Sequence, residues 1–371
     1  MRCPHCHRDQ AVDIIDTSMP TIGSASPPEI LKHSRMAPLR ICWCPGCLIG
    51  FNASPLPDAE LAFLYDHYPY ISPRRGIGAT RYGGLIALVE ARCRKDGLLV
   101  DIGCSEGYFL EQMGRRGFSR LHGVEPGPQA VEAAGCGFPV HHGYWTPGLF
   151  AAGSVDTIVM MHVLEHLPDP AAALVAMREM LAPGGRIAIE VPDFGGFHHQ
   201  HLVFLSATYL RRVAGTAGLK ICDLHADGTV LRVLLAHAGD PVAEAPAHVE
   251  DLPDRCARAA ARMRGLKEGV ERTISEAHGP ILWWGAGQAS VILLNLCDPR
   301  LLGKADLVVV DGDARKCGLG IPGLEQRVRA VAEVAGQAFA TLVIASSFAA
   351  EISARADQAG IVRERTVVQC P

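Results

Sequence analysis

The feature that most constrains this chain is a glycine-containing turn between an apolar strand and a helix. Residues 98–102 (LLVDI) predict a buried strand, residues 103–107 (GCSEG) follow it, and residues 108–116 carry helical periodicity. Glycine at 103 and 107 lets the backbone turn tightly beside a ligand, and the helix start offers free N–H groups to an anion. Glu125 ends the next predicted strand, where a carboxylate can accept hydrogen bonds from ribose hydroxyls. The spacing predicts a nucleoside-containing cofactor but does not separate NAD from S-adenosylmethionine (SAM).

Strands and helices alternate on both sides of this turn. Further strands are predicted at 121–125, 156–161 and 186–191, and helices at 80–95 and 170–181. Such alternation predicts an α/β fold with a parallel, doubly wound sheet. A Pro- and acid-rich stretch at 239–254 is interpreted as a linker. After it come a helix at 255–278 and a second βα pattern, which starts at 281–287 (ILWWGAG) and has strands at 305–310 and 341–346.

Length and charge limit the classes of function. A chain of 371 residues exceeds one ordinary core, and its net charge of −4 gives no reason to bind nucleic acid or an anionic membrane. The sequence contains neither an 18-residue apolar run nor a signal peptide, so we expect a cytoplasmic protein without a membrane partner. The predicted domains are 1–72, 73–240 and 241–371.

Five of the thirteen cysteines fall within the first 47 residues. Cys3 and Cys6 form one C-x-x-C pair, and Cys44 and Cys47 form another. Four thiolates can close a tetrahedron around Zn²⁺, which leaves no open position for water, so the site is expected to be structural. Cys42 offers an alternative C-x-C pairing with Cys44, and a nearby histidine is an alternative ligand.

Residues 156–169 (DTIVMMHVLEHLPD) resemble the segment that follows strand four in class I SAM-dependent methyltransferases. The similarity runs from 100 to 191 and includes the Pro-Gly-Gly turn at 183–185. No DPPY- or NPPY-type sequence is present, which disfavours methylation of amino groups on nucleic-acid bases. The resemblance implies SAM as the cofactor, with contacts from Asp101, Gly103, Cys104, Gly107, Glu125, Pro126 and His162.

A narrower resemblance covers nearly the whole chain. The order of zinc cysteines, a Tyr-rich segment at 65–72 (YDHYPYIS), a SAM domain and a C-terminal Rossmann-like domain resembles the sugar C-methyltransferases of deoxysugar biosynthesis. Residues 199–206 (HQHLVFLS) are similar to that family's HEHFSYFS segment, and 311–318 (DGDARKCG) resemble its DxxxxKxG element. Gln200 replaces the usual Glu, and His198 replaces the usual Tyr. The resemblance implies a nucleotide-linked sugar as acceptor, with the C-terminal domain as a wall for its nucleotide.

Carbon methylation beside a ketone needs a base and donors for the resulting enolate. The resemblance makes His201 the first candidate for the base, with Gln200 and Tyr70 as donors, and with His166 and His198 as further catalytic candidates. An O- or N-methyltransferase of another small metabolite or glycan is the alternative. A non-catalytic protein that binds zinc, SAM and a partner is more remote.

Overall fold

The computed structural model describes residues 1–67, 72–75, 79–248, 250–346 and 348–369. The chain divides into two compact units that interleave along the sequence. The first unit contains residues 1–13 and 41–253, and the second contains residues 14–40 and 254–371. Residues 14–40 therefore group with the C-terminal part of the chain, although the predicted domains follow one another along the sequence.

The first unit is built on a seven-stranded sheet with the order β10-β11-β8-β7-β4-β5-β6. Its strands are β4 (Leu98–Ile102), β5 (Arg120–Glu125), β6 (Val140–His142), β7 (Val155–Met161), β8 (Leu181–Pro192), β10 (Leu219–Ala226) and β11 (Val230–His237). Strands β4 to β8 are parallel, whereas β11 is antiparallel to β8 and to β10. The predicted α/β fold is confirmed. The sheet is mixed because the short β10–β11 connection permits only an antiparallel hairpin.

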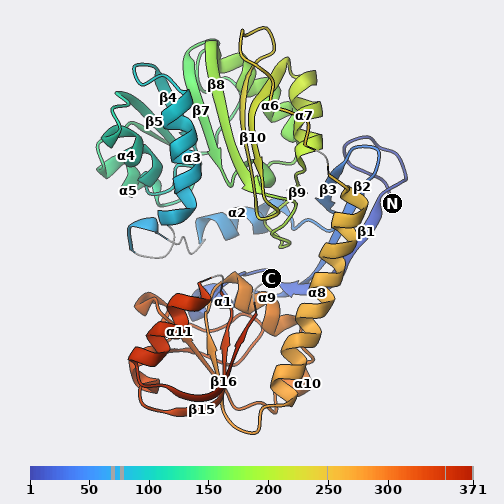
Figure 1. Ribbon diagram of the computed structural model, residues 1–371, viewed down its shortest axis with the longest axis vertical. Coiled ribbons are helices and arrows are strands. Elements are labelled where there is room, and N and C mark those ends of the chain that lie inside the picture. The colour runs from blue at the N-terminus through green and yellow to red at the C-terminus, as the bar shows by residue number, and fades with distance from the viewer. Residues whose placement is uncertain (68–71, 76–78, 249, 347, 370–371) are drawn as a thin grey trace. The chain divides into compact units, whose positions relative to one another are not determined.

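Helices cover both faces of this sheet (Figure 1). One face carries α3 (Ala79–Arg92), α4 (Tyr108–Arg115) and α5 (Ala130–Gly135), and the other carries α6 (Pro170–Met180) and α7 (Ala207–Thr216). Neighbouring strand residues enter different cores: Leu99 packs under α3 to α5, whereas Val100 packs on the side of α6 and α7. A strand that is buried on both faces is apolar at nearly every position, which explains the run at 98–102.

A smaller sheet has the order β1-β2-β3-β9. Its strands are β1 (Val12–Pro20), β2 (Met36–Cys44), β3 (Ile49–Asn52) and β9 (Val203–Phe204), and α2 (Asp58–Asp66) follows β3. Gly50 of β3 lies opposite Phe204 of β9. Sequence patterns predicted no strands before residue 80. The pairing partner β9 comes from a distant part of the chain, so no local periodicity reports it.

The second unit contains a five-stranded parallel sheet with the order β14-β13-β12-β15-β16. Its elements are α1 (Pro28–Leu31), α8 (Leu252–Ser275), β12 (Ile281–Trp284), α9 (Gln288–Leu296), α10 (Pro299–Leu302), β13 (Leu307–Asp311), β14 (Val328–Ala330), β15 (Ala338–Ile344), α11 (Ala349–Gln358) and β16 (Val362–Val368). The backbone N–H groups of Ala25 and Ser26 donate to the carbonyls of Ala286 and Gly320, at 3.1 and 3.0 Å. These bonds join the 14–40 segment to the second βα pattern, which the structure confirms.

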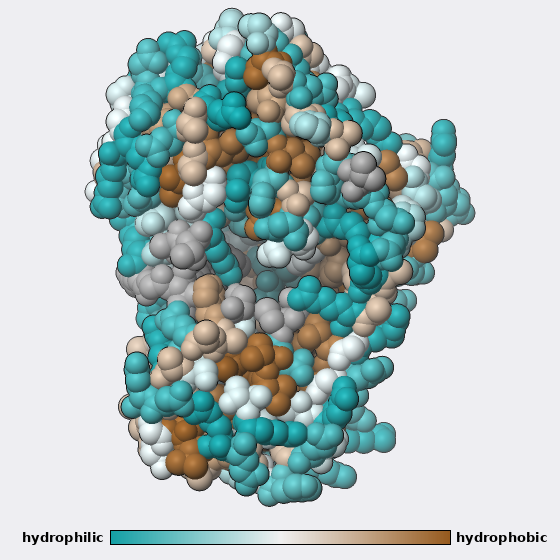
Figure 2. All heavy atoms as spheres, in the orientation of Figure 1, coloured by the Kyte–Doolittle hydropathy of each residue, from teal (hydrophilic) through white to brown (hydrophobic). Residues whose placement is uncertain are grey.

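Hydrophilic residues cover most of the face seen in Figure 2, and hydrophobic residues occur on it in separate groups. No helix in the described ranges is long and apolar enough to cross a membrane.

Candidate functional site

The loop between β4 and α4 keeps two backbone positions that only glycine fits. Gly103 and Gly107 have φ angles of 80° and 77°. A Cβ atom at Gly103 would lie 2.4 Å from Cγ2 of Val163, and one at Gly107 would lie 3.2 Å from Cα of Ala133. The missing side chains let the loop turn tightly at the start of α4, where the first N–H groups of a helix have no intrahelical acceptor and are available to a ligand. This loop fits the nucleoside part of SAM.

Two carboxyl groups lie beside this loop at the ends of β4 and β5. Asp101 is buried, and this burial, together with the nearby charge of Glu125, raises the pKa of Asp101 to about 8. Glu125 accepts hydrogen bonds from the backbone N–H groups of Ser105 at 2.9 Å and Gly127 at 2.8 Å. These bonds fix the orientation of the Glu125 carboxylate, which keeps further lone pairs for a ribose diol.

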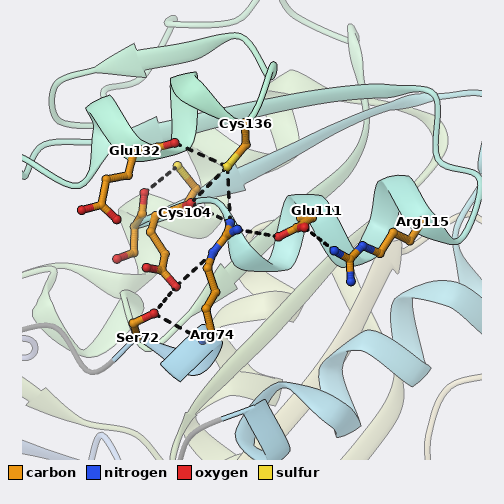
Figure 3. A network of polar contacts seen from close by, with 9 residues as sticks. Ser72, Arg74, Cys104, Glu111, Arg115, Glu132 and Cys136 are labelled. Atoms are coloured by element: carbon orange, nitrogen blue, oxygen red, sulfur yellow. Dashed lines mark hydrogen bonds and ion pairs between the residues drawn. The ribbon is translucent and has the colours of Figure 1, made fainter. Parts of the chain in front are cut away.

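A polar network, which sequence analysis missed, fastens residues 72–75 to the cofactor loop (Figure 3). Ser72 donates to the buried carboxylate of Glu106 at 2.7 Å, and Nε of Arg74 lies 3.3 Å from the same carboxylate. The Arg74 guanidinium also pairs with Glu111 at 2.7 Å and contacts Sγ of Cys136 at 3.4 Å. The available sequence signal for this network was an acidic residue, Glu106, inside the glycine motif. If such a carboxylate is buried, it needs a partner.

The predicted cofactor residues lie at the carboxyl ends of three neighbouring strands, since β4 pairs with both β5 and β7. They are Asp101, Gly103, Cys104 and Gly107 after β4, Glu125 and Pro126 after β5, and His162 after β7. His162 has a φ of 54°, and its Nδ1 lies 3.3 Å from Oε1 of Glu165. Burial by itself would lower the pKa of His162, but the carboxylates of Glu165 and Glu190 raise it.

The predicted catalytic histidines form a cluster close to this edge. The ring centroid of His201 lies 3.8 Å from that of His198 and 4.9 Å from that of His166. Nδ1 of His166 lies 2.8 Å from the backbone carbonyl of Gln200, so this nitrogen carries the donated proton. Sequence analysis predicted a role for the side chain of Gln200. The hydrogen bond with His166 is made by the backbone carbonyl of Gln200.

Burial keeps the central imidazole of this cluster neutral. His201 is buried, and this burial, followed by the charges of His198 and His166, holds its pKa well below the ordinary value. Burial and the same kind of repulsion lower the pKa of His198 to about 3. At neutral pH His201 therefore keeps a nitrogen lone pair free for a proton or a metal ion.

Two members of the cluster were not predicted as site residues. The Tyr65 hydroxyl lies 3.3 Å from Nδ1 of His166, and Oε1 of Glu165 lies 3.9 Å from Nε2 of His201. Glu165 is adjacent to His166 in the 3-10 turn η2 (Leu164–His166), which was the only local signal for it. Tyr70, which was predicted as a donor, lies outside the described residues.

The four cysteines of the two C-x-x-C pairs converge. Their Sγ atoms all lie within 4.8 Å of one another, with 3.9 Å between Cys3 and Cys47 and 3.7 Å between Cys6 and Cys44. A tetrahedral zinc site with Zn–S bonds of about 2.3 Å requires Sγ separations of about 3.8 Å. Cys42 points elsewhere, with its thiol 3.1 Å from Oδ1 of Asp13. The geometry thus fits Zn²⁺ and separates Cys42 from the other four.

The second unit has its own glycine turn after β12, but its acidic residue is already paired. Oδ2 of Asp311 accepts hydrogen bonds from the N–H of Ala286 and from Nζ of Lys316, each at 2.8 Å. An Asp–Lys pair at the position that would bind a ribose leaves less capacity for a second nucleoside cofactor.

Comparisons with known proteins agree with a SAM site at the glycine loop after β4, because the relatives found are named methyltransferases. Ubiquinone biosynthesis O-methyltransferase of Aeromonas salmonicida is 28% identical to this chain, over 34% of this chain and 64% of the relative. The enzyme of the same name from Cupriavidus pinatubonensis is 28% identical, over 38% of this chain and 59% of the relative. The chain therefore spans less than two thirds of the length of these relatives.

Similar solved structures also cover less than half of the chain each. A SAM-dependent methyltransferase from Mesorhizobium loti is 14% identical and covers 43% of this chain and 98% of its own, with a TM-score of 0.36. Geranyl diphosphate C-methyltransferase from Streptomyces coelicolor A3(2) is 16% identical and covers 49% of this chain and 83% of its own, with a TM-score of 0.37.

The sheet order, the glycine loop after β4 and the acid that ends β5 together have the arrangement of the α/β Rossmann-like methyltransferase fold. Residues 75–224 match the family described as a methyltransferase domain. Over these residues the chain thus contains a methyltransferase domain.

Glu125→Ala is expected to weaken SAM binding by at least roughly tenfold. The substitution removes charge-assisted hydrogen bonds to ribose hydroxyls, which contribute about 1.5–3 kcal/mol each. It also removes the acceptor for Ser105 and Gly127. Calorimetric titration with SAM measures the change, and Glu132→Ala, which alters an acid on α5, serves as the matched control. An unchanged dissociation constant would mean that the cofactor binds elsewhere.

Asp101→Asn is expected to stabilise the cofactor-free protein at pH 7 by about 1–3 kcal/mol. With a pKa of about 8, the folded protein holds this proton more tightly than the unfolded chain. The protonated carboxyl therefore contributes stability at low pH that is lost as the pH rises toward 8. Urea unfolding of both proteins between pH 5.5 and 8.5 tests this, because the two stabilities should diverge with pH. Parallel profiles would contradict the assignment.

Proposed function

We propose that the protein transfers the methyl group of SAM to a small-molecule acceptor that binds beside His166 and His201. The observation that carries this proposal is the buried imidazole cluster, which begins a few residues after the β7 end that supplies His162 to the cofactor edge. Methyl transfer demands mainly positioning of the acceptor and removal of its proton. The free lone pair of the buried His201 imidazole suits that second task.

When bound, SAM supplies an electrophilic methyl group on a sulfonium sulfur. The neutral Nε2 of His201 takes the proton from the acceptor, and the Glu165 carboxylate, 3.9 Å away, stabilises the imidazolium that forms. Tyr65 lies beside His166 and can donate its hydroxyl proton to an acceptor oxygen on which negative charge develops.

For the acceptor, we propose a nucleotide-linked keto-deoxysugar that is methylated on carbon next to its carbonyl. The support is the resemblance of residues 199–206 to the active-site segment of the sugar C-methyltransferases, together with the order of domains. The second unit would then serve as a wall for the nucleotide part of the acceptor.

Methylation of an oxygen is the second candidate, favoured by the relatives named ubiquinone biosynthesis O-methyltransferases. A phenol or alcohol would lose its proton to the same histidine. These relatives match only 34% and 38% of this chain, and a shared fold supports enzymes with different acceptors.

Hydrogen exchange of the acceptor separates the two candidates. A keto-deoxysugar nucleotide incubated with the enzyme in deuterated water should exchange its α-hydrogen, followed by NMR, and should accept the labelled methyl group of SAM on carbon. Methyl transfer to a phenol without α-hydrogen exchange in the sugar would replace carbon methylation with oxygen methylation. Absence of transfer to sugar nucleotides, phenols and alcohols alike would overturn the proposed activity.

We also propose that Cys3, Cys6, Cys44 and Cys47 bind one structural Zn²⁺. The support is the convergence of the four Sγ atoms, with separations that match a thiolate tetrahedron. The bound ion would link residues 3–6 to the carboxyl end of β2. Arg212 of α7 reinforces this arrangement by donating to the carbonyl of Gly46 at 2.8 Å and to that of Cys47.

A further inference from the structure

The imidazole cluster also contains the donor atoms of a metal site that is separate from the cysteines. Glu165, His166 and His201 each offer one ligand atom, and these atoms lie within 4.8 Å of one another. Glu165 and His166 come from η2, and His201 comes from the segment that leads into β9. The N–H of Leu202 donates to the carbonyl of Glu165 at 2.9 Å, which fixes the two segments together.

Two atoms of this cluster lack a partner where burial demands one. Glu165 is only 2% exposed, and its Oε2 has no hydrogen-bond partner in the described part of the chain. Nδ1 of the buried His201 also has none. A buried carboxylate oxygen without a donor is unfavourable unless a proton or a cation compensates it. A cation within reach of Glu165 and both imidazoles would remove that cost.

The contacts around the cluster orient it as a metal site requires. Nδ1 of His166 donates a hydrogen bond to the Gln200 carbonyl at 2.8 Å. The lone pair on Nε2 of His166 is therefore available to bind a metal ion. Metal-binding histidines are held in this way, with the second ring nitrogen donating to a carbonyl or a carboxylate. Oε1 of Glu165 is in turn 3.3 Å from Nδ1 of His162, which fixes the carboxylate.

We propose that Glu165, His166 and His201 bind a divalent transition-metal ion whose remaining positions are open to an oxygen of the acceptor. Two imidazoles and one carboxylate suit Zn²⁺, Fe²⁺ or Co²⁺ rather than Mg²⁺, which prefers oxygen ligands. Metal binding stands without the proposed methyl transfer, whereas the acceptor's coordination rests on that function. With the metal bound, His201 would be a ligand instead of the base, so these two roles of His201 are alternatives, and the metal would polarise the acceptor oxygen.

Metal stoichiometry and cobalt spectra of the full-length protein test this site without reference to activity. After incubation with Zn²⁺ and removal of excess metal, the wild type should hold about two ions per chain. Glu165→Gln and His166→Gln should each hold about one, and Cys44→Ser should also hold about one. With Co²⁺, the ion left in Cys44→Ser should show visible absorption without thiolate-to-cobalt charge transfer. His225→Gln, which changes a histidine paired with Asp227 at 3.2 Å, should keep both ions.

Calorimetric SAM binding checks that each variant is folded. One ion in the wild type that survives both Glu165→Gln and His166→Gln would overturn the metal site. Two ions in an enzyme that methylates no acceptor would instead keep the metal site and remove the proposed function. Full methyl transfer by protein that retains only the cysteine-bound ion would refute coordination of the acceptor.

Discussion

Cys44→Ser should abolish stoichiometric zinc binding at the cysteine site and lower the thermal midpoint by about 10 °C or more. Structural zinc in small modules contributes an apparent binding free energy of about 10–16 kcal/mol near neutral pH. For a unit of roughly 200 residues, each kcal/mol shifts the midpoint by about 2–4 °C. Cys3, Cys44 and Cys47 also belong to the core that packs on α6 and α7, so the loss is expected to spread into the first unit.

Cys42→Ser is the matched control, because this cysteine is also buried and lies on the same strand β2. A serine hydroxyl can replace the thiol that faces Asp13, so the cysteine-bound zinc should remain and the midpoint should change little. Elemental analysis and calorimetry measure both quantities. If Cys42→Ser loses as much zinc as Cys44→Ser, the assignment of Cys3, Cys6, Cys44 and Cys47 as the zinc ligands is wrong.

His201→Ala should lower turnover by about 10²–10⁴ while leaving SAM affinity nearly unchanged. That range is the usual contribution of a positioned general base. His201 is buried, and its described side-chain contacts include His166, His198 and Glu165 and no residue of the glycine loop. The same variant should slow exchange of the acceptor's α-hydrogen, because that exchange needs the base but not the methyl group.

The SAM titration separates a chemical role of His201 from a folding defect, since a defect would weaken SAM binding as well. His225→Ala is a suitable control on an exposed histidine outside the cluster. Full activity in His201→Ala would remove His201 from the mechanism and direct attention to His166.

The cofactor half of the candidate site could be predicted because its residues lie within short sequence patterns. Gly103 and Gly107 flank a turn between a strand and a helix, and Glu125 ends the following strand. Parallel strands bring their carboxyl ends to one edge, so the order of elements along the chain already indicates which residues meet. The cysteine pairs are similar, because each C-x-x-C presents its two thiols from one tight turn.

The acceptor half could be predicted only in part. The histidines at 166 and 201 stood out through resemblance, but Glu165 was marked only by its position next to His166, and no pattern indicated that Tyr65 contacts His166. Glu165 reaches His201 because Leu202 hydrogen-bonds to its backbone, and Tyr65 reaches His166 from α2. Such contacts depend on packing between segments that are far apart in sequence.

The sequence by itself determined the α/β architecture, the glycine loop with Glu125, and the two cysteine pairs, since each depends on spacing within one or two elements. The tertiary structure alone decided that residues 14–40 belong with the C-terminal unit and that β3 pairs with β9. It also decided that Arg74 forms an ion pair with Glu106 and that Lys316 forms one with Asp311. The physical reason is that strand pairing, burial and ion pairing are satisfied by whichever partner folding brings near, and local periodicity carries no record of that partner.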